Sequence, residues 1–273
     1  MAVITISRQY FSGGDEIAQM VAEKLGYKLY DRNAVYKKII ELGCPEEKIK
    51  NYDEVRPGIF SALSKYNDEY LYYLKTAILT IAEEGNCVIE GRGACFILEG
   101  IENHVSVRVF EDAEDRIRKL AEKDGISLQT AARKIIRSDK KQYNFIKYYF
   151  DADIRQAREQ NLLLNTSISD VTSCAQAIIG FTKAVATSER EHKGDEVLGE
   201  LLLGQKIINM LRFVYFIDID SMKAEVEDKK ITLQGIASTK GIVDNAIKIL
   251  NCEFSDYDVV SKIRIVQGGM GER

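Results

Sequence analysis

"ITISRQYFSGGDEIAQMVAEKLG", residues 4–26, indicates the fold class of the first part of the chain. A short β-branched run predicts a strand, and Ser12, Gly13 and Gly14 after it predict a turn. Apolar residues then recur at helical spacing over residues 17–25, and a glycine follows as a C-cap. This order is typical of a site where backbone amides at a helix N-terminus bind phosphate oxygens.

The turn lacks the residue that would be most diagnostic of phosphate binding. The Walker pattern has Lys and then Ser or Thr after its second glycine, whereas Asp15 and Glu16 follow Gly14 here. Asp15 favours the helix but repels a phosphate. A helix N-terminus contributes about 0.3–2 kcal/mol to holding an anion, and a cation on a transferred phosphoryl group about 4–7 kcal/mol. Any phosphoryl transfer therefore needs cations from elsewhere in the chain.

Composition narrows the class of protein. The chain has 273 residues, 45% of them hydrophobic and 29% charged, with a net charge of −4, which argues against a broad nucleic-acid-binding face. No apolar run is long enough for a membrane span, and no signal peptide is recognisable. The five cysteines form no CxxC pair, so we expect reduced thiols, a cytoplasmic protein and no metal site.

The first two-thirds of the chain alternate strand and helix patterns. This alternation predicts crossover connections and a parallel sheet. The Tyr-rich stretch 59–84 predicts a helix with one buried face, and a base-stacking role for its tyrosines is the alternative. The predicted strands are residues 3–7, 27–31, 104–110 and 161–165, together with one strand within residues 86–93.

A second domain follows a change of pattern. Residues 186–196 are polar and lack periodicity, which predicts a linker between a domain at 1–185 and a domain at 197–267. The second domain begins with a predicted helix over residues 197–210. A hairpin that turns at Asp228 and Lys229, another helix and a last strand over 260–266 complete a small αββαβ unit of the α+β class.

Residues 1–185 resemble the cytidylate kinase-like proteins, which belong to the P-loop nucleoside monophosphate kinases. The resemblance implies an α/β fold of the P-loop NTPase type, a parallel sheet with helices on both faces. Members of this branch commonly lack the Walker lysine and keep a Gly-Ser-Gly-Gly-Arg loop. Phe11 and Asp15 depart from that loop at its first glycine and its arginine. The segments that carry the resemblance are "ITISRQYFSGGDEIA", "LGYKLYDRNAVY", "VIEGRG", and "RSDKKQYNFIKYY" followed by "NLLLNTS".

The resemblance implies an ATP-dependent phosphotransferase that acts on CMP or a similar small acceptor. Mg²⁺ would be bound through the nucleotide phosphates, with no metal ligand from the protein. The alternative is a non-catalytic nucleotide or phosphate sensor with a degenerate loop. A small-molecule nucleotide is the expected partner and nucleic acid is not, while an oligomer is left open.

The candidate site residues combine the glycine turn with cations later in the chain. Arg92 corresponds to an arginine that the family uses on the acceptor phosphate, with a structural salt bridge as the alternative. Asp31 orients a substrate hydroxyl or a magnesium-bound water, or caps a helix. The catalytic candidates are Arg8, Arg92, Arg133 and Arg137; the nucleotide-binding candidates are Ser12, Gly13, Gly14 and Arg116; the substrate-binding candidates are Asp31, Arg92, Asp139 and Lys140.

The C-terminal region resembles a BON domain, a small module associated with binding phospholipid or other ligands. "EVEDKKITLQGIAS" carries the resemblance, with Gly235 at the glycine after the Thr-Leu pair. Another α+β regulatory fold is the alternative. Contact with a membrane or lipid through this domain has no other support in the sequence, and the domain contains no catalytic constellation.

Overall fold

The computed structural model describes residues 2–47, 49, 65–154 and 160–266. The chain divides into two compact units, Met1–Asp195 and Glu196–Arg273. A five-stranded sheet belongs to the first unit and a three-stranded sheet to the second.

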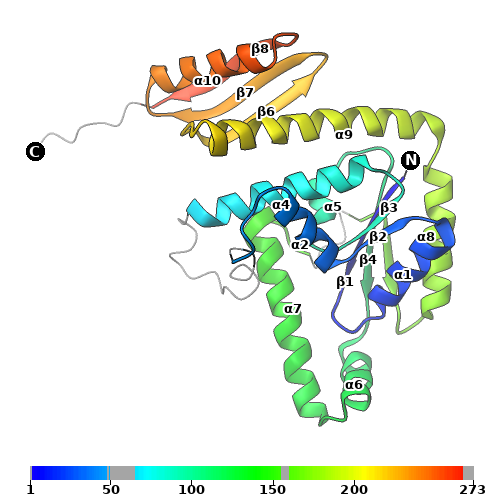
Figure 1. Cartoon of the computed structure of the whole chain (residues 1–273). Helices are drawn as coiled ribbons and strands as arrows, with labels where there is room; N and C mark the ends of the chain where they lie inside the picture. The colour runs from blue at the N-terminus through cyan, green and yellow to red at the C-terminus, as the bar shows by residue number, and fades with distance from the viewer. Residues whose placement is uncertain (1, 48, 50–64, 155–159, 267–273) are drawn as a thin grey trace, which may run out of the picture. The chain divides into compact units, whose positions relative to one another are not determined.

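The five-stranded sheet is parallel, with the strand order β2-β3-β1-β4-β5 (Figure 1). All five strands predicted from the sequence are present, because short apolar runs buried on both faces are typical of a parallel sheet. β1 lies in the centre of the sheet, so the turn that follows it opens at the middle of the carboxyl edge. The strands are β1 Val3–Arg8, β2 Lys28–Tyr30, β3 Cys87–Glu90, β4 His104–Phe110 and β5 Leu162–Asn165.

Helices cover both faces of this sheet, which confirms the predicted fold class. Figure 1 shows α1 and α8 on one side of the sheet and α4 and α5 on the other. The helices of this unit are α1 Gly14–Leu25, α2 Arg32–Glu41, α4 Lys65–Glu83, α5 Ala94–Ile97, α6 Ala113–Asp124, α7 Leu128–Phe150 and α8 Val171–Val185.

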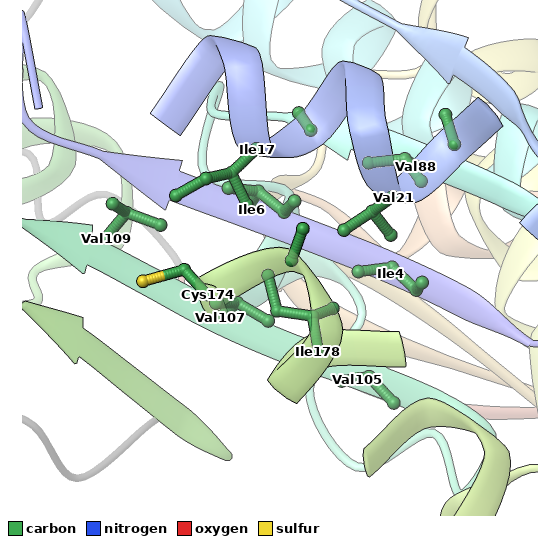
Figure 2. Packing of buried hydrophobic residues seen from close by; sticks show 13 residues of the cluster. Ile4, Ile6, Ile17, Val21, Val88, Val105, Val107, Val109, Cys174 and Ile178 are labelled. Atoms are coloured by element: carbon green, nitrogen blue, oxygen red, sulfur yellow. The ribbon is translucent and has the colours of Figure 1, made fainter. Parts of the chain in front are cut away.

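A hydrophobic core lies between the sheet and the helices α1 and α8. Figure 2 shows Ile17 and Val21 of α1 and Ile178 of α8 packed with Ile4 and Ile6 of β1. All five side chains are fully buried, and such burial contributes about 1.5–3 kcal/mol for each. This packing holds the start of α1 against the end of β1, and so it sets the position of the glycine turn.

The opposite face of the sheet is more polar. Side chains alternate between the two faces of a strand, so the buried Thr5 and Ser7 of β1 point away from α1. Thr5 Oγ1 lies 2.8 Å from His104 Nε2. The buried Ser106 and Arg108 of β4 share this face, because their neighbours in the strand belong to the core of α1 and α8.

The Tyr-rich stretch forms α4 over the part that the structure describes, while residues 59–64 of the predicted helix lie outside the described residues. Tyr70, Leu74 and Ile78 recur at helical spacing and are buried. This pattern supports the prediction of a core-facing helix. No helix in the described part of the chain has the length and apolar character that a membrane crossing needs.

The segment 186–196 differs from the expectation of a linker without regular structure. Helix α9, Ser188–Asn209, runs through it and starts before the predicted helix at residue 197. Thr187 Oγ1 accepts a backbone hydrogen bond at the helix start, and Lys193 pairs with Glu189 at 3.0 Å one turn away. Capping and ion pairing therefore support a helix that hydrophobic periodicity does not reveal. The position of the domain boundary stays a prediction.

The second unit has the predicted αββαβ order. β6 pairs antiparallel with β7, and β8 pairs parallel with β7 across a connection that contains α10. The predicted hairpin turn is confirmed: Asp228 and Lys229 have φ of 46° and 60°, as a two-residue I′ turn requires. After α9 come a π-helical turn, Met210–Val214, and then β6 Asp220–Glu227, β7 Lys230–Ala237, α10 Lys240–Glu253 and β8 Asp258–Ile265.

Candidate active site

The carboxyl ends of β1, β3 and β4 lie side by side, because β1 is between the other two strands. Parallel α/β sheets bind ligands at this edge. Each strand end leads into a segment with a candidate cation: Arg8 ends β1, Arg92 follows β3, and Arg116 lies in α6 after β4. The topology therefore brings together candidates that are far apart in the sequence.

The turn before α1 has the left-handed backbone of a glycine turn. Gly13 has φ 74° and caps α1, and Phe11 has φ 68° although it is not glycine. A side chain at such a φ is strained. The Phe11 ring packs with the apolar cluster of α6 and α7 and lies 5.3 Å from Lys123 Nζ, contacts that offset this strain. The turn thus keeps its shape without the family's first glycine.

Ser12 is buried and holds the turn closed. Its hydroxyl donates to Gln9 O at 2.9 Å, and its carbonyl accepts from Thr166 Oγ1 at 2.9 Å. Ser12 N–H donates to the same Gln9 carbonyl at 3.3 Å. An α-helix leaves its first N–H groups without intrahelical partners, so Gly14 and the residues just after it are the donors that face a ligand.

Arg8 is held by two carboxylates. Its Nε donates to Asp15 Oδ1 at 2.5 Å, and its Nη2 donates to Glu90 Oε2 at 3.0 Å. The sequence predicts Arg8 as a catalytic cation and Asp15 as a charge that repels phosphate. Because the structure pairs the two, each neutralises part of the charge of the other, and an anion at the turn competes with both carboxylates for Arg8.

Glu90 is a site residue that the sequence analysis missed. Its side chain is 6% exposed, and burial raises its pKa to about 7, although the charge of Arg8 opposes the rise. The charges of Asp15 and Asp31 raise this pKa further, which places three carboxylates in one electrostatic neighbourhood. The sequence feature that could have revealed Glu90 is its position as the acidic residue that ends the otherwise apolar run "CVIE".

Arg92 lies in the turn between β3 and α5 and has φ 55°. Its guanidinium carbon is 4.6 Å from the centre of the Tyr36 ring and 5.6 Å from the centre of the Phe145 ring. The charge of Arg92 also acts on Tyr70, where it opposes the rise in pKa that burial causes. Helices α2, α4 and α7 therefore all contribute aromatic side chains around this arginine.

Arg116 and Asp139 pair with each other. Arg116 Nη1 and Nη2 donate to the two oxygens of Asp139 at 3.0 and 2.9 Å, and its Nε donates to Glu111 O at 3.1 Å. Arg116 Nη1 also donates to Tyr10 O at 3.2 Å. This bidentate pair ties α6 to α7 and to the glycine turn. The sequence assigns Arg116 to the nucleotide and Asp139 to the substrate. In either role, the residue has to break its ion pair with the other before it binds the ligand.

The remaining lid cations lie on an exposed face of α7. Arg133 and Arg137 are one helical turn apart, and Lys140 continues the same face. Arg133 Nε donates to a carbonyl of its own helix, Gln129 O, at 3.4 Å. The buried Ile135 faces the other way, toward the cluster with α6. The structure therefore groups these cations with one another on α7.

Asp31 caps α2, since its Oδ1 accepts from Ala34 N at 2.7 Å. This is the structural alternative that the sequence left open, and it leaves Oδ2 for another role. Gln142, which the sequence analysis did not single out, donates from Nε2 to Arg8 O at 2.9 Å and ties α7 to the end of β1. A half-buried amide partner of this kind has no recognisable pattern in a single sequence.

Comparison with known proteins shows which protein family the chain is similar to. The model of the cytidylate kinase-like family matches residues 3–168. The cytidylate kinase of Pyrococcus horikoshii is 27% identical over 168 residues, which cover 60% of this chain and 80% of that protein. The cytidylate kinase of Archaeoglobus fulgidus is 26% identical over 178 residues, which cover 64% of this chain and 92% of that protein.

Among solved structures, an uncharacterized protein from Eubacterium ventriosum is similar to the chain with a TM-score of 0.53 and 22% identity. The match covers 67% of this chain and 98% of that one. At this identity the likeness shows the fold alone.

Proposed function

The chain belongs to the cytidylate kinase-like family, and we propose that it transfers a phosphoryl group from ATP to CMP or a similar small phosphorylated acceptor. In this proposal ATP phosphates lie on the turn at Ser12, Gly13 and Gly14. The acceptor phosphate lies on Arg92, and α6 with α7 forms the lid. Catalysis then consists of positioning and charge neutralisation, which is what phosphoryl transfer requires of a protein.

The observation that carries the proposal is the meeting of three elements at one edge of the sheet. The free N–H groups at the start of α1 can hold an anion, and Arg92 presents a cation one strand away. Arg116 joins the third strand end to the same turn through Tyr10 O at 3.2 Å. Donor and acceptor phosphates bound at these points would lie next to each other.

Mg²⁺ fits this edge as an ion that arrives with the nucleotide. It is usually held by one or two carboxylates together with waters and substrate phosphates. Asp31 uses only Oδ1 to cap α2, so its other oxygen would hold such an ion, directly or through a bound water. When bound, Mg²⁺ neutralises phosphate charge, which matters in a turn without lysine.

The lid cations complete the proposal. Arg133, Arg137 and Lys140 share an exposed face of α7, where they would close over the transferred phosphate. The pair of Arg116 and Asp139 links this helix to α6. A phosphate that competes for Arg116 would release Asp139 for the substrate, so this pair is the proposed coupling between nucleotide binding and lid closure.

Calorimetry with ATP, with and without Mg²⁺, followed by a coupled assay over a panel of nucleoside monophosphates, tests the proposal. We expect weak ATP binding that depends strongly on Mg²⁺, because Asp15 opposes the anion, and slow turnover that is largest with CMP. No detectable ATP binding at millimolar concentration would contradict the proposal.

The second candidate is a nucleotide sensor without catalysis. The observation that favours it is the engagement of Arg8 by Asp15 and Glu90 in a turn that has no lysine. A sensor binds ATP but turns over no member of the monophosphate panel, and the Arg92→Ala variant then leaves ATP binding unchanged. Turnover with any acceptor decides for the kinase.

For the second unit, the BON-like assignment, contact with lipid and the cytoplasmic location stay predictions, as does the oligomeric state. Co-sedimentation of the full chain with anionic phospholipid vesicles tests the lipid contact. Every residue proposed here for phosphoryl transfer lies in the first unit, so we propose that the second unit has no part in the chemistry.

A further inference from the structure

Arg108 occupies an unusual position in the middle of β4. Val107 and Val109 on either side belong to the core under α1 and α8, so Arg108 points to the opposite face of the sheet. It is 7% exposed. A parallel strand buried on both faces normally carries apolar residues, so a charge at this place calls for a partner.

Arg108 has very little to bind to within the protein. Its Nη1 donates to Ser7 Oγ at 2.6 Å, which is its one hydrogen bond to the described residues, and it makes no ion pair with them. A guanidinium carries five N–H donors, so most of its hydrogen-bonding capacity is unused. Burial lowers the pKa of Arg108 to about 10, which leaves it charged at neutral pH.

The neighbouring arginines are neutralised, and Arg108 is not. Arg8 has Asp15 and Glu90, and Arg116 has both oxygens of Asp139. The charges of Asp139, Arg116 and Arg8 act on Arg108, which places these groups in one electrostatic neighbourhood, although Asp139 makes its ion pair with Arg116. Arg108 is thus the cation of this group without a carboxylate of its own among the described residues.

We propose that Arg108 and the Ser7 hydroxyl form a binding subsite for the phosphate of the acceptor. This inference rests on the proposed function. The acceptor is assigned here because Arg108 faces away from α1, whose N-terminus is the proposed place of the donor phosphates. Cys95 of α5 is near enough to Arg108 to act on its charge, and Arg92 lies two residues before that helix. In this proposal Arg92, from the turn after β3, and Arg108, from β4, bind the same phosphate.

The test compares Arg108→Gln with Arg118→Gln, which removes an arginine on the exposed side of α6. Calorimetry of the full chain with CMP, cytidine, ATP and inorganic phosphate separates the sources of the anion. We expect Arg108→Gln to weaken CMP binding by about 10- to 100-fold and to abolish phosphate binding, because hydrogen bonds to a charged group are lost. Cytidine and ATP binding should stay within about twofold, and Arg118→Gln should leave all four unchanged.

Unchanged CMP binding in a folded Arg108→Gln protein would overturn the subsite, as would wild-type protein that binds neither CMP nor phosphate. Weakened ATP binding with unchanged CMP binding would overturn the assignment to the acceptor. If Arg108→Gln does not fold, Arg108→Lys takes its place. It keeps the charge without the planar fork, and we expect about tenfold weaker CMP binding. The protein could bind CMP in a way that depends on Arg108 and still show no turnover. That result would support the subsite and contradict the kinase proposal.

Discussion

The turn after β1 and the turn after β3 both enter a helix through a left-handed glycine, Gly13 at φ 74° and Gly93 at φ 69°. Each also contains a residue with a side chain at positive φ, Phe11 at 68° in the first turn and Arg92 at 55° in the second. The two backbones are therefore alike, while the side chains at the strained positions differ in kind. In the first turn a ring anchors the loop, and in the second a cation is presented.

The surroundings of the cations differ as well. Arg8 lies between Asp15 and Glu90, at 2.5 and 3.0 Å, whereas Arg92 lies against the rings of Tyr36 and Phe145. Carboxylates neutralise a cation, but aromatic rings attract it without an opposite net charge. The difference teaches that two turns with similar backbones place their cations in different surroundings, with carboxylates around Arg8 and aromatic rings beside Arg92.

Among substitutions in the two turns, Arg92→Ala should have the largest effect on activity. We expect kcat/KM for the acceptor to fall by about 10³-fold or more, since a cation on the phosphoryl group is worth about that much. Arg8→Ala should cost about tenfold, because its charge is already shared with two carboxylates. A coupled assay measures both, with Arg118→Ala as the control. Equal losses for Arg8 and Arg92 would show that the carboxylates do not neutralise Arg8.

Alanine at the glycines of the two turns separates backbone strain from steric clash. A Cβ on Gly93 would lie 2.1 Å from the Phe150 ring, a Cβ on Gly13 would lie 3.1 Å from Val171, and a Cβ on Gly26 would meet open space. We expect losses in the free energy of unfolding of about 2–4 kcal/mol for Gly93→Ala and about 1–2 kcal/mol for Gly26→Ala, with Gly13→Ala between them.

Chemical denaturation measures this series. Gly26→Ala is the matched control, because its φ of 68° is close to that of the other two glycines while it has no neighbour within 4 Å. The same loss for all three variants would mean that the strain of a left-handed alanine is the whole effect.

Glu90→Gln should release Arg8 and make the first turn more like the second. Burial raises the pKa of Glu90 to about 7, so in the wild type Glu90 becomes charged and competes for Arg8 as the pH rises through 7. Wild-type affinity for Mg-ATP should therefore decrease between about pH 6 and pH 8. We expect the variant to bind about tenfold more tightly at pH 8 and to lack this decrease. Calorimetry at several pH values measures it.

The same substitution makes a prediction for stability. A carboxyl whose pKa is raised by folding stabilises the fold while it is protonated, and this contribution is lost as the pH rises through the folded-state value, about 7. The wild type should lose stability between about pH 4.5 and pH 7, the ordinary and the folded-state pKa of Glu90, and Glu90→Gln should not. Parallel pH profiles for the two proteins would show that Glu90 is not the group that titrates.

Asp15→Ala should have the smallest effect. Asp15 is 75% exposed, so its pair with Arg8 is screened by solvent, and its removal should tighten Mg-ATP binding by only about two- to fivefold. Glu16→Ala, in the same helical turn but without a contact to Arg8, is the matched control for loss of a charge near the helix N-terminus. Equal effects of the two variants would assign the change to general charge and not to the pair.

Much of the fold could be predicted from local pattern. Each strand of the five-stranded sheet is a short apolar run bounded by polar or turn residues, and the hairpin at Asp228 and Lys229 follows from alternation on both sides of it. The start of α9 could not be predicted from periodicity, because Thr187 and the pair of Glu189 with Lys193 stabilise it through hydrogen bonds and charge.

The candidate site was predicted only in part. The glycine turn and Arg92 stand next to recognisable strands, so their sequence context indicates their position. Glu90, Gln142 and Arg108 were missed because their roles depend on residues that are distant in the sequence. No pattern within one segment indicates that Arg8 meets a carboxylate on the neighbouring strand.

The sequence by itself determined the strand, turn and helix order of the first unit, the αββαβ order of the second, and the family to which the chain belongs. These follow from periodicity and turn chemistry, which act over a few residues. Only the tertiary structure decided which cations are neutralised. Arg8 and Arg116 have carboxylate partners and Arg108 has none among the described residues, because the pairing of charges is set by the order of parallel strands and not by neighbours in the chain.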